Sequence, residues 1–199
     1  MCTGTNSIPD WCLQTQRSYA DAMGSVYDEI SPSLADWIRR QKMFFVATAA
    51  SGDEGTVNVS PKGYDTLRVL DGSTLAYLDL TGSGVETIAH LRENGRITLM
   101  WCAYEGPARI VRIHGSGEVL STDDERIADR FEFERGARAV ILVHADRVSD
   151  SCGYAVPLME YSGERPRLHE WAASKTDDEL IEYRRQKNAA SIDGLPALD

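Results

Sequence analysis

The chain has 199 residues, of which 42% are hydrophobic and 26% charged, so it can bury one sizeable core but is short for two full domains. Its formal net charge of -10 and its pI of about 4.9 argue against a general nucleic-acid or anionic-membrane binder, because such proteins need a basic surface. A local basic pocket is still compatible with this charge balance.

The cysteines and histidines carry no sign of a metal centre. They form neither a CxxC pair nor the spacing of a zinc site, so we expect no metal and no disulfide framework. No apolar run is long enough to span a bilayer, and the first twenty residues lack the apolar centre of a signal peptide. We therefore expect a soluble, cytoplasmic protein.

The predicted elements follow a polar N-terminal stretch, residues 1–22, that shows no clear periodicity. Leu34, Trp37 and Ile38 have the spacing of a helical stripe and predict a short helix over 33–40. Residues 43–50 and the alternating segment 56–63 predict a β-hairpin. Further strands are predicted at 74–80, 96–104, 108–120 and 139–148.

Helices are predicted between and after these strands. Acids that follow Thr122 suit the positive end of a helix over 122–133, and the charged tail from 168 to 188 also has a helical pattern. Six strands linked mostly by tight turns cannot form a regular βαβ array. The fold class predicted is therefore mainly β (α+β), an antiparallel barrel or sheet with peripheral helices.

A Gly-Ser-Gly turn at 81–84 joins the strand at 74–80 to a helix. Ser83 and Glu86 have the spacing of a capping box, and Asn94-Gly95 supplies a stop. A glycine-rich turn before a helix can instead bind a phosphate through backbone amides that point outward, although Glu86 disfavours an anion there. The turn matches neither the dinucleotide fingerprint nor a P-loop, and its sequence leaves both interpretations open.

Three cations stand in strand contexts of this acidic chain and suggest an anion site. Lys62 ends a strand in Ser60-Pro61-Lys62-Gly63, either as a solvated side chain or as a fixed charge for a phosphate or a ring edge. Arg109 and Arg112 lie on the strand at 108–120, where Arg112 and His114 share a face. Trp101 is a candidate ligand contact, although its apolar neighbours favour a place in the core or a subunit interface.

Three motifs taken in order carry a family resemblance. They are the hairpin ending in VNVSPKG, the strand-turn-helix YLDLTGSGVETIAHLRENGRI and the hairpin LMWCAYEGPARIVRIHGSGEV. Over about residues 24–150 the chain resembles the pyridoxamine 5′-phosphate oxidase-like family of flavin-binding split barrels. The resemblance implies a six-stranded split β-barrel, a homodimer, and one FMN in each of two clefts at the subunit interface.

The resemblance also implies cofactor contacts. Lys62 matches the lysine that ends the family's first flavin-contacting strand, and Arg112 matches the arginine of its Gln-Val-Arg motif. The other implied contacts are Val59, Ser60 and Pro61 along the isoalloxazine, and Thr81, Gly82, Ser83 and Gly84 near the phosphate and ribityl chain. On this interpretation the turn relies on Lys62 and Arg112 for positive charge.

Some positions depart from the oxidase itself. Val57, Gly84-Val85 and Ile110 stand where the oxidase has an arginine, an Arg-Lys pair and a glutamine. Arg167-Leu168-His169-Glu170 echoes its Arg-Leu-His-Asp-Arg segment, but a charged helix follows. The resemblance therefore does not imply pyridoxamine phosphate as the substrate.

These inferences divide the chain into a flexible extension (1–22), an FMN-binding split-barrel domain (23–161) and a C-terminal helical extension (162–199). The implied function is an FMN-dependent oxidoreductase that exchanges a hydride or electrons through flavin N5 with a nicotinamide or another small molecule. No residue is identified as a catalytic acid or base. The alternatives are a flavin-binding module without turnover, for storage or sensing, and the same fold carrying a deazaflavin or haem.

Overall fold

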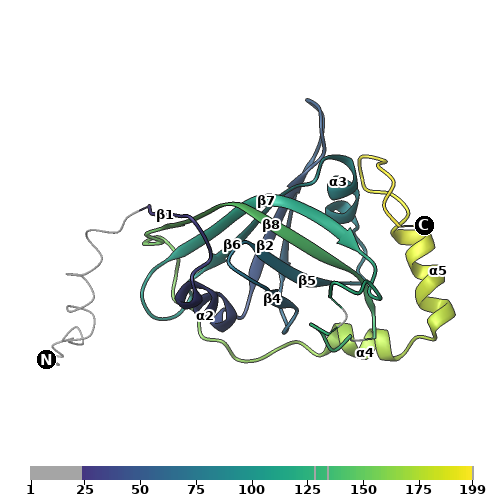
Figure 1. The fold of residues 1–199 in the computed structure, drawn as a ribbon. Helices are drawn as coiled ribbons and strands as arrows, with labels where there is room; N and C mark the ends of the chain where they lie inside the picture. The colour runs from purple at the N-terminus through teal and green to yellow at the C-terminus, as the bar shows by residue number, and fades with distance from the viewer. Residues whose placement is uncertain (1–23, 128, 134, 199) are drawn as a thin grey trace, which may run out of the picture.

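The computed structural model describes residues 24–127, 129–133 and 135–198, so the extension predicted at 1–22 lies outside the described residues. A single antiparallel sheet dominates the described part and curls into a half-barrel (Figure 1). Its strands are β1 (Val26–Tyr27), β2 (Phe44–Ala49), β3 (Val57–Lys62), β4 (Leu67–Val69), β5 (Thr74–Leu80), β6 (Arg96–Cys102), β7 (Ile110–Leu120) and β8 (Ala137–Ser151).

The strand order confirms the mainly antiparallel β class. It runs β3-β2-β6-β7-β8-β5-β4, with β1 paired to β8 outside this path. The 15-residue β8 holds the sheet together, because it pairs with β1, β5 and β7. The described sheet has eight strands where six were predicted, since β1 and β4 are too short to show an alternating pattern.

The described residues include four helices around the sheet: α2 (Pro32–Arg40), α3 (Glu86–Asn94), α4 (Arg167–Ala173) and α5 (Asp177–Lys187). Figure 1 shows α3 and α5 toward one end of the sheet and α2 toward the other. Within the described residues, none of the helices combines the length and the apolar character needed to cross a bilayer.

The main core lies on the concave face of the half-barrel. Along β2, β6 and β7 the residues that point to this face are buried, and those between them are more exposed. Trp101 of β6 is 1% exposed and stacks on Phe44 of β2, with 5.9 Å between the ring centroids. Buried side chains of α2 and α3 pack on the same cluster. Removing such apolar surface from water supplies most of the stability of a sheet of this kind.

The helix predicted over 122–133 is wrong. The described residues of this segment form successive turns. Asp124, Ile127 and Arg130 each donate the backbone N–H to the carbonyl three residues earlier. The carboxylate of Asp124 accepts from the backbone N–H of Arg126 at 2.9 Å, and the Arg126 side chain binds it as well. Such local bonds from an aspartate compete with helical bonding.

The C-terminal helix predicted over 168–188 is two helices. The break falls before Thr176, whose hydroxyl accepts from the backbone N–H of Glu179, while the Glu179 carboxylate accepts from the backbone N–H of Thr176. This capping box starts α5, so the acidic triplet at 177–179 belongs to a first turn, where negative charge is favoured.

Candidate functional site

The turn at 81–84 does not form the capping box predicted for it. Helix α3 begins at Glu86 after Val85, and no side chain caps its N-terminus. The Glu86 carboxylate instead lies against Gly84, where an added Cβ would be 2.5 Å from Oε2. Gly95 does end the helix, with φ 72° and its N–H donated to the carbonyl of Leu91, as predicted.

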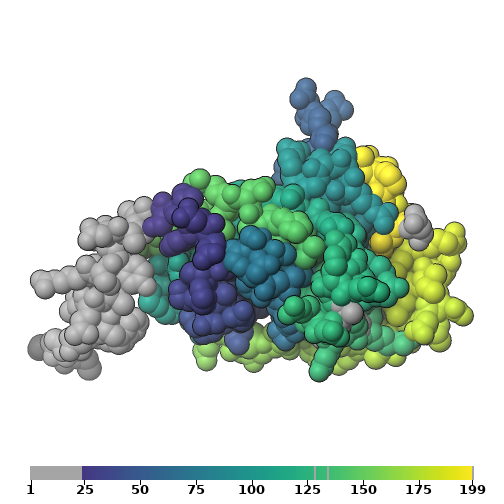
Figure 2. Space-filling model, viewed as in Figure 1, coloured from purple at the N-terminus to yellow at the C-terminus, as the bar shows by residue number. Residues whose placement is uncertain are grey.

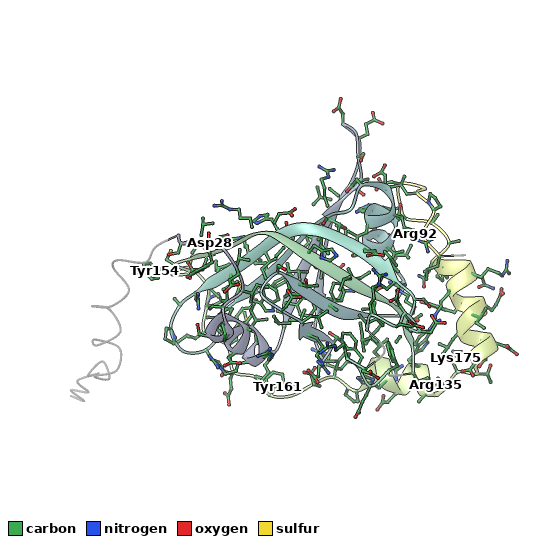
Figure 3. The ribbon with its side chains drawn as sticks, viewed as in Figure 1. Asp28, Arg92, Arg135, Tyr154, Tyr161 and Lys175 are labelled. Atoms are coloured by element: carbon green, nitrogen blue, oxygen red, sulfur yellow. The ribbon has the colours of Figure 1, made fainter. Side chains whose placement is uncertain are left out.

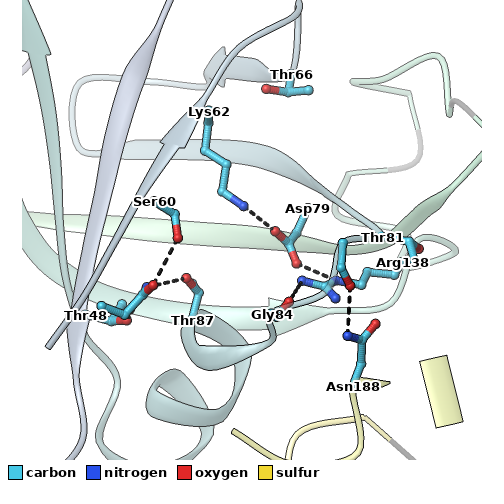
Figure 4. A network of polar contacts seen from close by, with 12 residues as sticks. Thr48, Ser60, Lys62, Thr66, Asp79, Thr81, Gly84, Thr87, Arg138 and Asn188 are labelled. Atoms are coloured by element: carbon cyan, nitrogen blue, oxygen red, sulfur yellow. Dashed lines mark hydrogen bonds and ion pairs between the residues drawn. The ribbon is translucent and has the colours of Figure 1, made fainter. Parts of the chain in front are cut away.

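A buried ion-pair cluster stands beside this turn (Figure 4). The Asp79 carboxylate of β5 binds Lys62 Nζ of β3 through one oxygen and Arg138 Nε of β8 through the other, each at 2.8 Å. Burial by itself would raise the pKa of Asp79, but the positive charges of Lys62 and Arg138 outweigh it and hold that pKa below its ordinary value. Two cations share one carboxylate, so the cluster carries a net charge of one positive unit.

Arg138 connects this cluster to the turn. Its Nη2 donates to the carbonyl of Gly84 at 2.8 Å, and its side chain is only 5% exposed. Its Nη1 is buried without a hydrogen-bond partner among the described residues. A buried charged donor without an acceptor is costly, so Nη1 marks a place where an anion would be favoured.

The C-terminal segment covers the first half of the turn. From α5, Arg184 Nε donates to Thr81 Oγ1 at 2.9 Å, and just beyond α5 Asn188 Nδ2 donates to the carbonyl of Gly82 at 3.0 Å. Thr81 is buried as a result, whereas Ser83 and Gly84 are exposed. Only the second half of the turn is therefore open to a ligand within this chain.

The predicted site residues on β3 point in two directions. Ser60 and Lys62 lie on the face of the sheet that carries the core, since Lys62 is paired with the buried Phe44. Ser60 donates to Asn58, whose amide binds two threonine hydroxyls from β2 and α3 (Figure 4). Val59 and Pro61 lie on the opposite, outer face.

Arg112 also lies on the outer face and does not join the turn of the same chain. The register links Pro61, Phe45, Met100 and Arg112 in one row across β3, β2, β6 and β7. Arg112 donates to Ser151 Oγ at 3.1 Å, and the neighbouring Val111 and Ile113 are buried on the core side. Within this chain the structure therefore does not bring the predicted contact Arg112 to the turn. Trp101 lies in the core, as its neighbours favoured.

The sequence reasoning missed Asp79, Arg138, Arg184 and Asn188. One signal was present: Asp79 is the single charged residue in the strand TLAYLDL, and an acid there must be paired when the strand is buried. The arginines gave no comparable signal, because one precedes an apolar strand and the other belongs to a basic run of α5.

Fold and sequence together place the chain in a class and then in a family. The curled antiparallel sheet with helices at its ends is a split-barrel fold. The profile of the family described as pyridoxamine 5′-phosphate oxidase matches residues 30–152. A relative from Aspergillus flavus, the pyridoxamine 5′-phosphate oxidase family protein ustO, is 41% identical over 192 residues, which cover 86% of this chain and 77% of the relative. The chain belongs to the pyridoxamine 5′-phosphate oxidase family.

Solved structures are similar at lower identity. HupZ of Group A Streptococcus is 24% identical, with a TM-score of 0.46 over 60% of this chain and 91% of that chain. The FAD binding protein of Mycobacterium smegmatis is 13% identical, with a TM-score of 0.45 over 62% of this chain and 96% of that chain.

Proposed function

We propose that the protein binds FMN and works as an oxidoreductase that exchanges a hydride or electrons with a small molecule. The observation that carries this proposal is the cluster of Lys62, Asp79 and Arg138, with its excess positive charge, beside the exposed half of a strand-to-helix turn. The proposal also draws on membership of the pyridoxamine 5′-phosphate oxidase family, whose flavin-contacting motifs this chain resembles.

The residues at the turn fit a phosphate group. The backbone amides of Ser83 and Gly84 lie in the exposed part of the turn, just before the positive end of α3. Counting Arg184 and Glu86 with the cluster gives three cations against two carboxylates, so the surroundings remain positive. The unpartnered Nη1 of Arg138 would gain an acceptor. Lys62 and Arg138 would hold the phosphate, and the cluster would keep their side chains in place.

The rest of the proposed site needs a second copy of the chain. Val57 and Val59 of the edge strand β3 are 73% and 60% exposed on the outer face, which also carries Arg112. Apolar side chains on such a face suit contact with another protomer or with a flat ring. We infer a homodimer in which one protomer supplies the turn and Lys62, and its partner supplies outer-face residues to the same FMN.

When bound, FMN supplies hydride or electron transfer at N5. The chain's own residues bind and orient the group: cations hold the phosphate, and apolar residues of β3 shield the ring from water. No described side chain at the turn is assigned as an acid or base.

The absorption spectrum of the purified protein tests the proposal. We expect flavin bands, either as purified or after incubation with FMN and removal of free flavin. Bleaching of these bands by NADH or NADPH under anaerobic conditions would establish turnover-competent reduction, whereas bound flavin that no reductant bleaches would favour the storage or sensing module. Haem bands, or a deazaflavin mass in the extracted cofactor, would replace FMN. A protein that stays colourless would overturn the proposal.

A further inference from the structure

A second cationic hollow lies under the C-terminal helix. It has a volume of about 300 Å³ and is lined by Arg92 of α3, Arg138 of β8 and Arg184 of α5, with aliphatic side chains between them. Figure 3 shows Arg92 on the side of α3 that faces the C-terminal segment, and Figure 2 shows that segment packed against α3. Three elements far apart in the sequence thus bring arginines to one place.

The charge of this hollow is poorly balanced. Among the described residues, Asp79 is the one carboxylate in ion-pair contact with any of the three arginines, and it is shared with Lys62. Burial and the nearby positive charge of Arg138 both lower the pKa of Arg184. Guanidinium groups that repel one another in a chain of net charge -10 would be relieved by an oxyanion between them.

The lining also indicates what the anion carries. Val119, Leu120, Ala139, Ile181 and Leu198 supply apolar surface next to the arginines. Ile181 is 61% exposed although it belongs to this lining, so the hollow is open at α5. A pocket with a few cations and an apolar wall suits a small anion that bears a compact hydrocarbon part.

We propose that this hollow is a binding site for a small organic phosphate monoester, distinct from the place proposed for FMN. The phosphate lies between Arg92 and Arg184, each of which can donate to its oxygens, and the organic part lies against the aliphatic lining. Arg138 then stands between the two sites, because its Nη2 binds the turn at Gly84 while its side chain lines the hollow. The proposal does not require a flavin.

Calorimetric titration of the full chain with phenyl phosphate at low salt tests the site. We expect saturable binding of phenyl phosphate that weakens as the salt concentration is raised. Inorganic phosphate should bind more weakly, because it leaves the aliphatic lining exposed to water. Phenol should not bind, because it carries no charge. Arg92→Gln should lower the affinity for phenyl phosphate by about tenfold, since one charge-assisted contact is lost. Arg92 makes no ion pair or hydrogen bond within the described residues, so this variant should fold normally.

Two matched controls isolate the hollow. Arg40→Gln makes the same change of charge on the distant helix α2 and should leave binding unchanged. Ile181→Glu places a carboxylate at the rim and should abolish binding of phenyl phosphate. Ile181→Gln introduces a side chain of the same shape as glutamate but without its charge, so this variant should retain binding.

Repeating the titration on protein saturated with FMN separates the two sites. Binding of phenyl phosphate that persists with the flavin retained supports a distinct site. Displacement of the flavin would overturn it, because the hollow would then be the seat of the FMN phosphate. Absence of saturable binding, or equal weakening by Arg92→Gln and Arg40→Gln, would also overturn it. If FMN does not bind at all, the titration of the flavin-free chain still decides the question.

Discussion

Asp79 is the residue that sets how much positive charge the turn presents. It is 0% exposed, and its two oxygens are divided between Lys62 and Arg138. Its pKa is held below the ordinary value by those cations despite the opposing effect of burial, so it is ionised at neutral pH. Without this carboxylate, two cations would face each other in a site with little access to solvent.

Asp79→Asn should therefore destabilise the fold. We expect a loss of about 3 kcal/mol in the free energy of unfolding near pH 7, because removing one partner of a buried ion pair leaves the other charges uncompensated. Urea denaturation measures this loss, with Asp178→Asn on the exposed face of α5 as the control. The folded pKa of Asp79 is depressed, so its contribution is complete above the unfolded value of 3.8 and is lost as the pH falls through the folded value. A deficit that stayed constant at lower pH would contradict this assignment.

Lys62→Ala should weaken the binding of FMN and leave the oligomeric state unchanged. Arg138 still compensates Asp79 in this variant, so the fold is retained while one cation is lost near the turn. We expect affinity to fall by about tenfold, measured by flavin fluorescence titration. Lys187→Ala, an exposed lysine of α5, is the matched control. Unchanged flavin occupancy would remove Lys62 from the site.

The sequence could predict the cation at Lys62 but not its partner. An isolated acid in the apolar strand TLAYLDL indicates a buried pair, yet the choice of partner depends on how β3 approaches β5 across the half-barrel. These strands do not pair with each other, so no local pattern records their contact. Arg138 and Arg184 depend on the same long-range arrangement.

At the scale of elements, strands with a clear alternation were predictable, and β5 coincides with its predicted bounds. The period of two residues that buries one face is a strong signal. Terminal signals proved less reliable: Ser83 and Glu86 match a capping box that does not form, whereas Thr176 and Glu179 form one inside a segment predicted as continuous helix. Both have the same spacing, so spacing alone does not determine whether the box forms.

The segment that follows α5, residues 188–198, is called the strap here, because its contacts hold this helix over the turn. Thr56, between β2 and β3, donates its hydroxyl to Asp193 at 2.6 Å, and His90 Nε2 of α3 lies 3.4 Å from the same carboxylate. Ala197 is buried in the main core. The strap is thus fastened both by polar contacts near Asp193 and by apolar packing at its end.

Asp193→Ala should loosen the strap without unfolding the sheet. We expect faster hydrogen exchange in residues 188–198 and at Thr81, whose hydroxyl accepts from Arg184 of α5, while β7 and β8 remain protected. Asp178→Ala, which removes an exposed acid of α5, should change neither region. Exchange that stayed slow at Thr81 would show that Asp193 does not fasten the segment.

For the whole molecule, the two faces of the sheet have different tasks. The inner face carries the main core, the buried ion pairs and the turn, whereas the outer face carries Arg112, an apolar stripe on β3 and a second buried cluster over β5, β7 and β8. In the function proposed above, two protomers share one FMN, which lets predicted contacts on opposite faces reach the same cofactor. Periodicity could assign residues to faces, but not which face meets a second chain.

Val59→Glu tests this division at the level of assembly. Val59 is 60% exposed on the outer face, so a glutamate there costs a monomer little but would place charge within the proposed interface. We expect light scattering to show a monomer that has also lost most of its capacity for FMN, with an unchanged circular dichroism spectrum. Ile192→Glu, at an equally apolar and 74% exposed position on the strap, should remain dimeric. A Val59→Glu protein that stays dimeric and flavin-loaded would move the interface to another face and leave Arg112 without a cofactor to contact.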